Sequence, residues 1–411
     1  MLVQAPAGSA LCRAGASLCE PSARVRICLV YDCLFPHTVG GAERWYRNLG
    51  ERLAADGHSV TYLTLRQWDR GSDPGVAGVD VRAVGPRMAL YVSDASGRRR
   101  ILPPLVFGLG VLWHLLRYGR RYDAVHTASF PYFSLLAAAV ARPLGRYAIV
   151  VDWHEVWSRA YWRAYLGRTG GAVGALVQRL CARVPQRAFC FSRLHAARLR
   201  GEGLRGEPTV LTGEYAGPLE RPQPAPARDV VVFAGRHIPE KRVPALLPAL
   251  AEARATAPEL RAEILGDGPE RPRVLAEIER LELGDAVDAP GFVEHARVED
   301  ALRTALCMVL PSSREGYGLV VVEAAARGTP SVVVAGEDNA ATELIDDGEN
   351  GFVAASASAE DLAAAILRVR AAGPPLRDAT AAWFERNARR LSLEHSLETV
   401  LAAYGHGAVA A

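Results

Sequence analysis

The chain has 411 residues, of which 50% are hydrophobic and 7% aromatic, so it is long enough for two globular domains with full cores. Its seven cysteines are odd in number and form no C-x-x-C pair, which favours reduced thiols in a cytoplasmic protein and argues against a zinc site. Residues 1–215 carry 28 Arg against 15 Asp and Glu, whereas residues 216–411 carry 20 Lys and Arg against 30 Asp and Glu. A basic half attracts anionic membranes, nucleic acids or phosphate-bearing substrates, and charge alone does not choose among them.

The chain begins with residues 1–24, which are rich in Ala, Gly and Ser and lack the basic start and apolar core of a signal peptide. We expect a disordered extension there. From Val25 a strand, a loop with Gly40 and Gly41, a helix and a second strand follow, which predicts a parallel strand pair joined by a helix. The two glycines bring the backbone close to a phosphate or simply begin a helix, and taken alone they favour the helix start.

Residues 101–116 form an apolar segment flanked by arginines at 98–100 and 117–121. Two prolines and two glycines make the segment too short and too interrupted to span a bilayer comfortably. Two interpretations stay open: an amphipathic helix lying on a membrane surface, or a partly buried helix of the first domain.

The next apolar strand ends at Asp152 and places His154 and Glu155 at its carboxyl end, where parallel sheets hold ligand groups. A lone histidine is more often structural, but the charged and aromatic neighbours of His154 keep ligand contact open. An arginine-rich helix is predicted over residues 172–187, and Ser192 then reads as the N-cap of a further helix.

The domain boundaries follow from composition and periodicity. Proline density marks residues 218–228 as a linker. It separates an N-terminal domain at 25–217 from a second alternating α/β unit at 229–380. Residues 381–411 predict terminal helices that pack back on the first domain. The predicted fold class is α/β, with two doubly wound domains facing each other across a cleft.

Lys241 is the only lysine among 48 basic residues, and it lies five residues after Arg236 in a glycine-led loop at the end of a strand. A flexible ammonium and a rigid guanidinium bind phosphate differently, so a site that uses one does not freely accept the other. We predict that this pair binds phosphate, with chance as the alternative.

The stretch 311–323 joins a buried strand to a helix through a glycine-rich turn. Gly316 and Gly318 let the backbone approach a ligand, and the start of the helix suits phosphate. Glu315 and Glu323 lie two turns apart on one side of the structure, where they suit sugar and ribose hydroxyls. The alternative is a surface helix with two solvated glutamates.

Five motifs follow one another in the second half: GRHIPEKR, ILGDGPE, PGFV, SSREGYGLVVVEAAARGTPSVV and TELIDDGENGFV. In this order and spacing they resemble the donor domain of the retaining glycosyltransferases of family four, which have the GT-B fold of two Rossmann-like domains. The resemblance implies that residues 25–217 are the acceptor side and residues 229–380 the donor side. The resemblance reaches the first half through VGGAERWYRNLGERLAADGHSVTYLT and VVDWHEVW. The family's asparagine-glycine-aspartate stretch near the domain junction is absent, since residues 211–217 read LTGEYAG, and this leaves the hinge geometry in doubt.

The resemblance implies a role for each matching residue. Arg236 and Lys241 would hold the donor diphosphate, Glu315 the transferred sugar, and Glu323 the ribose. The other implied site residues are His154 near the transferred sugar and acceptor, Gly40 and Gly41 facing the diphosphate, Val293 at the base pocket, and Gly316, Tyr317, Gly318 and Leu319, whose amides surround sugar and phosphate.

The resemblance also implies the reaction: retaining transfer of a hexose from a nucleotide diphosphate sugar to an acceptor hydroxyl, without a metal or other cofactor. The basic half and residues 101–116 favour an acceptor that is lipid-linked or a glycan at the cytoplasmic membrane face. The alternatives are a soluble natural-product or small-molecule acceptor, a related GT-B nucleotide-sugar enzyme, or a non-catalytic partner. A nucleic acid is not an expected partner, and the expected location is the cytoplasm or its membrane surface.

Overall fold

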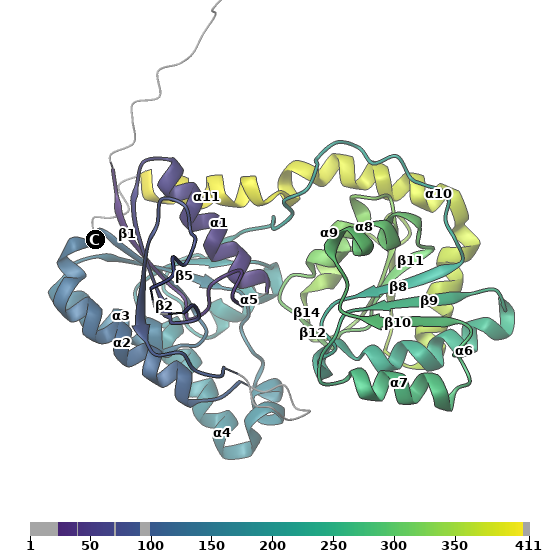
Figure 1. Ribbon diagram of the computed structural model, residues 1–411, viewed down its shortest axis with the longest axis horizontal. Coiled ribbons are helices and arrows are strands. Elements are labelled where there is room, and N and C mark those ends of the chain that lie inside the picture. The colour runs from purple at the N-terminus through teal and green to yellow at the C-terminus, as the bar shows by residue number, and fades with distance from the viewer. Residues whose placement is uncertain (1–23, 39, 70, 91–98, 406–411) are drawn as a thin grey trace, which may run out of the picture.

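The first domain of the computed structural model is a seven-stranded sheet covered by helices on both faces (Figure 1). The structure describes residues 24–38, 40–69, 71–90 and 99–405. The strand order is β3-β2-β1-β4-β5-β6-β7, and every neighbouring pair is parallel. The strands are β1 (Arg26–Val30), β2 (Ser59–Leu65), β3 (Asp80–Gly85), β4 (Ala124–Ala128), β5 (Ala148–Trp153), β6 (Arg187–Cys190) and β7 (Thr209–Val210). The helices are α1 (Gly41–Ala55), α2 (Leu102–Tyr118), α3 (Phe133–Gly145), α4 (Arg159–Ala182) and α5 (Arg193–Gly201).

The second domain repeats this design with a six-stranded parallel sheet of order β10-β9-β8-β11-β13-β15. Its strands are β8 (Val230–Ala234), β9 (Arg261–Leu265), β10 (Val287–Gly291), β11 (Cys307–Leu310), β13 (Ser331–Val334) and β15 (Gly351–Ala354). Its helices include α6 (Leu246–Thr256), α7 (Arg271–Arg280), α8 (His295–Thr304) and α9 (Leu319–Ala325). A separate two-stranded ribbon pairs β12 (Arg314–Glu315) with β14 (Asp338–Asn339). Two doubly wound sheets confirm the predicted fold class.

Strands such as β8 and β11 form because they are continuous apolar runs that both faces of a parallel sheet can bury. Every residue of β4, β11 and β13 is buried. Helix α1 is amphipathic and buries Trp45, Tyr46, Leu49 and Leu53 on the sheet. The five described cysteines are free and buried in this core: Cys28, Cys33, Cys181, Cys190 and Cys307.

The last two helices connect the domains (Figure 1). Helix α10 (Ala359–Leu391) begins on the second domain and kinks at Gly373, so the boundary predicted at 380 falls inside it. Helix α11 (Leu393–Gly405) lies on the first domain, where the Tyr404 hydroxyl is 2.7 Å from Nδ1 of buried His126. The Leu393 amide donates to the Tyr215 carbonyl at 2.7 Å. This bond joins the start of α11 to the segment of the chain that precedes the linker.

Helix α4 differs from the prediction, because it begins at Arg159 rather than at residue 172. The Ser158 side chain accepts from the Tyr161 amide and caps the helix, and Gly167 kinks the helix without ending it. The predicted N-cap at Ser192 is confirmed, since its side chain accepts from the His195 amide. The early start of α4 brings Ser158 and Tyr161 to the domain interface.

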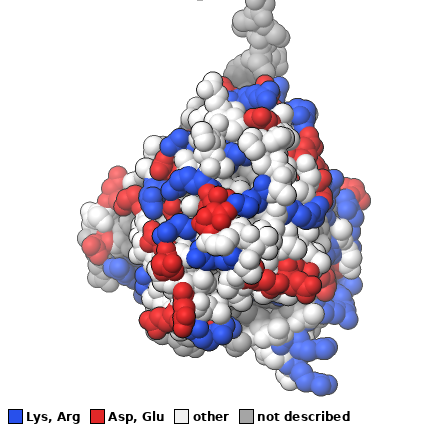
Figure 2. Space-filling model, turned by 90° about the vertical axis from the view of Figure 1, so that its right-hand side faces the viewer, with Lys and Arg blue, Asp and Glu red and all other residues white. Residues whose placement is uncertain are grey.

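Figure 2 shows the outer face of the second domain, on which acidic and basic side chains are interspersed. The acidic balance of the second half therefore forms no single-sign patch on this face. Within the described part of the chain, no helix is both long enough and apolar enough to cross a membrane.

Candidate active site between the domains

A hollow of ≈ 200 Å³ lies between the domains. Gly41 and Arg44 of α1 line one side, Glu214 of the junction lies between, and Leu319 and Glu323 of α9 line the other. A side chain at Gly41 would meet no atom within 4 Å, so the bare backbone faces open space there. The predicted residues Gly41, Leu319 and Glu323 therefore meet in one cleft, although they come from different domains.

Glu323 is half-buried beside this hollow. Burial raises the pKa of its carboxyl group, and the neighbouring basic side chains of His295, Arg327 and Arg44 act in the opposite direction. A carboxylate in such surroundings is available to accept hydrogen bonds from ligand hydroxyl groups.

Lys241 and Glu315 form an ion pair in the second domain. Lys241 ends a short 3₁₀ turn (Pro239–Lys241) in the segment that follows β8, and Glu315 lies in β12, after β11. The Lys241 Nζ lies 2.6 Å from Glu315 Oε1, and the Ser312 hydroxyl donates to the same oxygen at 2.6 Å. Glu315 is buried and Lys241 half-buried, so the pair is shielded from bulk water. This places a cation able to neutralise phosphate beside a carboxylate able to bind hydroxyls.

His154 lies directly after β5, at the carboxyl end of the first sheet. Its ring stacks on Phe191 with a centroid distance of 4.3 Å and an interplanar angle of 16°. Burial lowers the pKa of His154 to about 4, so the ring is neutral near pH 7. Its Nε2 is buried and has no hydrogen-bond partner within the described ranges. A neutral imidazole nitrogen without a partner is suited to contact a ligand.

Gly316 brings the second domain against His154. A Cβ atom at Gly316 would lie 2.8 Å from the His154 carbonyl oxygen, closer than real Cβ atoms come without a shift, and 3.1 Å from Glu155 Cγ, which is a tight contact. Gly318 is also required, because its φ is +100° and a Cβ there would lie 2.7 Å from Ala341 Cβ. The glycine-rich turn therefore permits a close approach between the domains as well as to a ligand.

The other predicted residues have different surroundings. Tyr317 is buried and donates its hydroxyl to the Thr212 carbonyl at 2.7 Å, while Gly40 has an extended backbone before α1. Arg236 is exposed and has no side-chain partner in the described structure. Val293 is half-buried and packs on the core of the second domain, beside the strongly exposed Phe292. The structure therefore joins Lys241 with Glu315 but shows no side-chain contact from Arg236 or Val293 to this pair within the described residues.

Asp152, which the sequence placed at the end of a strand with His154 and Glu155, is buried and makes contacts that the sequence did not indicate. It accepts from Trp45 Nε1 at 2.7 Å, and its other oxygen lies 2.9 Å from His126 Nε2. Sequence reasoning missed Glu214: burial, with repulsion from Asp152, raises its pKa to about 7. A glutamate in a polar loop looks solvated in the sequence, so nothing there indicates its burial.

Two family models match the chain in succession. The model described as Glycosyltransferase Family 4 matches residues 39–211, and the model described as Glycosyl transferases group 1 matches residues 220–389. Together they cover more than four fifths of the chain. The chain belongs to glycosyltransferase family 4.

Individual relatives and solved structures agree with this family. A D-inositol 3-phosphate glycosyltransferase of Nocardioides sp. is 36% identical over 191 residues, which are 43% of this chain and 41% of the relative. The chain therefore matches about two fifths of the length of such curated relatives. Sucrose-phosphate synthase from Thermosynechococcus elongatus has a TM-score of 0.77 at 20% identity over 94% of this chain and 100% of its own. HepE of Anabaena in complex with UDP-glucose has a TM-score of 0.69 at 18% identity, over 92% of this chain and 99% of its own. These structures establish the GT-B fold.

In the described residues, no group of three or more His, Cys, Asp or Glu side chains is arranged to hold a metal ion.

Gly316→Ala tests the close approach of the domains. Because the added methyl group has no room against the His154 carbonyl, we expect the interface to open and backbone amides around 152–158 to exchange hydrogen faster. Hydrogen–deuterium exchange mass spectrometry measures this. Gly41→Ala is the matched control, since its methyl group meets no atom within 4 Å. Equal exchange in both variants would show that Gly316 is not needed for closure.

Proposed function

We propose that the protein is a retaining glycosyltransferase that moves a hexose from a nucleoside diphosphate sugar to an acceptor hydroxyl. The observation that carries this proposal is the Lys241–Glu315 ion pair. Gly316, which follows Glu315 in the chain, lies against His154 of the opposite domain. This arrangement offers a cation for a diphosphate and a carboxylate for a sugar at one place. Membership of family 4 and the likeness to a structure that contains UDP-glucose support it.

In this proposal Lys241, with Arg236, neutralises charge on the departing nucleoside diphosphate, and no metal ion is needed for that purpose. Glu315 accepts hydrogen bonds from the transferred sugar, and Glu323 accepts them from the ribose. The neutral Nε2 of His154 contacts the sugar from the acceptor side. Retention of configuration, with attack by the acceptor on the face of the departing phosphate, is what the family resemblance implies.

Incubation with a panel of nucleoside diphosphate sugars, scored for nucleotide release with and without acceptor, tests the reaction. We expect release from at least one donor, and turnover that falls strongly in Lys241→Arg although the charge is kept. The reason is that Glu315, whose Oε1 is fixed by a hydrogen bond from Ser312, holds a compact ammonium at 2.6 Å, where a planar guanidinium does not fit in the same way. No release from any donor would contradict the proposed reaction, and wild-type turnover in Lys241→Arg would remove Lys241 from it.

For the acceptor, we propose a lipid-linked molecule or a glycan at the cytoplasmic membrane face. Helix α2 buries Phe107 and Val111 but exposes Leu109 by 68% and Trp113 by 71%. Leu102, Leu105 and Leu116 extend this apolar stripe along the helix. Shallow insertion of such a helix, together with electrostatic attraction, is enough for reversible membrane binding.

Helix α4 supplies the positive charge. A hollow of ≈ 270 Å³ on its surface is lined by Arg159, Arg163, Arg168 and Arg179, of which Arg179 pairs with Glu202. Arg159 and Arg163 are one helical turn apart, so their like charges repel unless an anion lies between them. A phosphate group suits the arginine fork. A soluble, phosphate-bearing acceptor is the second candidate, because one relative is named for D-inositol 3-phosphate.

Co-sedimentation with vesicles separates the two acceptor candidates. We expect binding to anionic but not to neutral vesicles at low salt, with loss of binding at high salt, because exposed charges are screened over about 10 Å at 0.1 M. Leu109→Ser combined with Trp113→Ser should abolish binding. Phe292→Ser, which removes an equally exposed aromatic side chain from the other domain, is the control. Absence of binding to anionic vesicles at low salt would leave the soluble acceptor as the better hypothesis.

A further inference from the structure

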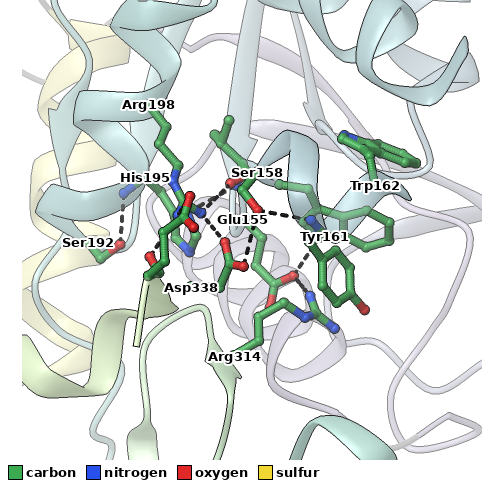
Figure 3. Close-up of polar contacts among 12 residues, drawn as sticks. Glu155, Ser158, Tyr161, Trp162, Ser192, His195, Arg198, Arg314 and Asp338 are labelled. Atoms are coloured by element: carbon green, nitrogen blue, oxygen red, sulfur yellow. Dashed lines mark hydrogen bonds and ion pairs between the residues drawn. The ribbon is translucent and has the colours of Figure 1, made fainter. Parts of the chain in front are cut away.

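The two domains meet through paired charges on one side of the candidate site (Figure 3). Arg314 of the second domain pairs with Glu155 of the first, and its guanidinium lies over the ring of Tyr161 at 4.4 Å. Asp338 accepts from Arg198 Nη1 at 2.5 Å and from the Ser158 hydroxyl at 3.1 Å. Arg314, Asp338 and Arg198 are each less than a fifth exposed at the side chain.

The ribbon of β12 and β14 links these contacts to the candidate site. Its register pairs Arg314 with Asp338 and Glu315 with Asn339. Successive residues of a strand point to opposite faces, so Arg314 and Asp338 share the face that contacts the first domain. Glu315 lies on the other face, where it meets Lys241. A movement of the first-domain contacts is therefore transmitted to Glu315 through one peptide unit.

The loop that carries Lys241 also contacts the first domain through a residue next to the ion pair. Glu240, its neighbour in the chain, accepts from the Tyr161 hydroxyl at 2.7 Å. The Glu240 carbonyl in turn accepts from the Ser313 amide at 2.8 Å, which holds this loop to the segment before β12. Lys241 thus follows Glu240, and Glu315 follows Arg314. Both Glu240 and Arg314 contact the first domain.

We propose that Arg314 and Asp338 are positioning residues: by pairing with Glu155 and Arg198 they hold Glu315 and Lys241 in register with His154 when the domains are closed. The catalytic consequence rests on the proposed glycosyl transfer, whereas the structural consequence does not. Because the interface is made of charged and hydroxyl groups that water can also satisfy, closure is reversible. We call the Arg314–Glu155 and Asp338–Arg198 pairs the latch. The latch therefore acts on the reaction without forming part of the donor pocket.

The test uses the full-length chain with Arg314→Met and Asp338→Asn, singly and combined. Small-angle X-ray scattering should show a larger radius of gyration for the double variant than for the wild type. Turnover should fall roughly 10- to 100-fold, because displacements of about 1 Å at a reacting centre have effects of this size. The affinity for a free nucleoside diphosphate should stay unchanged, since neither side chain touches Lys241 or Glu315.

Controls separate this role from general destabilisation. Arg303→Met breaks an exposed ion pair with Asp300 inside α8, and it should change neither scattering nor turnover. Arg314→Lys should recover part of the lost turnover, because it restores a cation opposite Glu155. Glu155→Gln added to Arg314→Met should cost little more than Arg314→Met alone if the two residues act as a pair.

The scattering experiment keeps the inference testable by itself. If the wild type turns over no donor, the proposed function fails, yet an increase in the radius of gyration still supports the latch. If Arg314→Met does not fold, Asp338→Asn, which nearly conserves shape, decides the question. Wild-type scattering and wild-type turnover in the folded double variant would overturn the inference.

Discussion

The candidate site depends on the ion pair between Lys241 and Glu315, whose atoms lie 2.6 Å apart although 74 positions separate the residues. Sheet topology makes this pair. Strands β8 and β11 are parallel neighbours, so their carboxyl ends lie together and the loops that follow them meet. The Ser312 hydroxyl donates to the same carboxylate oxygen and so fixes the position of the Glu315 side chain. Without the adjacency of these two strands, the only lysine of the chain would not meet Glu315.

The first domain completes the site at a close approach that only glycine allows. Gly316 lies against the His154 carbonyl, and the buried imidazole stays neutral because burial lowers its pKa to about 4. The contacts that maintain this approach are polar, unlike the apolar cores of the two sheets. A polar interface over two rigid cores permits opening and closing without loss of either fold. The terminal helices keep the domains associated, since α11 packs on the first domain while α10 begins on the second.

The strands and the two-domain fold were predictable because continuous apolar runs such as β8 and β11 are most stable when they are buried in parallel sheets. Lys241, Glu315, Glu323 and Gly41 were also within reach, because they lie in glycine-rich segments after strands or in the helices that these segments begin. Their roles stay predictions. The pairing of Lys241 with Glu315 was not predictable, since it requires the order of the strands in the sheet. Nothing in the sequence distinguished Arg314 from the other arginines of a chain that has 47 of them. The sequence also did not show that Ser158 caps α4, so the start of this helix was predicted too late.

The single lysine permits a direct measurement of the central claim. Protein labelled with ¹³C only in lysine should give one set of side-chain NMR signals, all from Lys241. We predict that the ε-methylene signal moves on titration with a nucleoside diphosphate, reaches saturation together with binding heat measured by calorimetry, and is displaced from its starting position in Glu315→Gln. A signal that stays in place while a nucleoside diphosphate binds would contradict the account, because Lys241 would then lie outside the donor site.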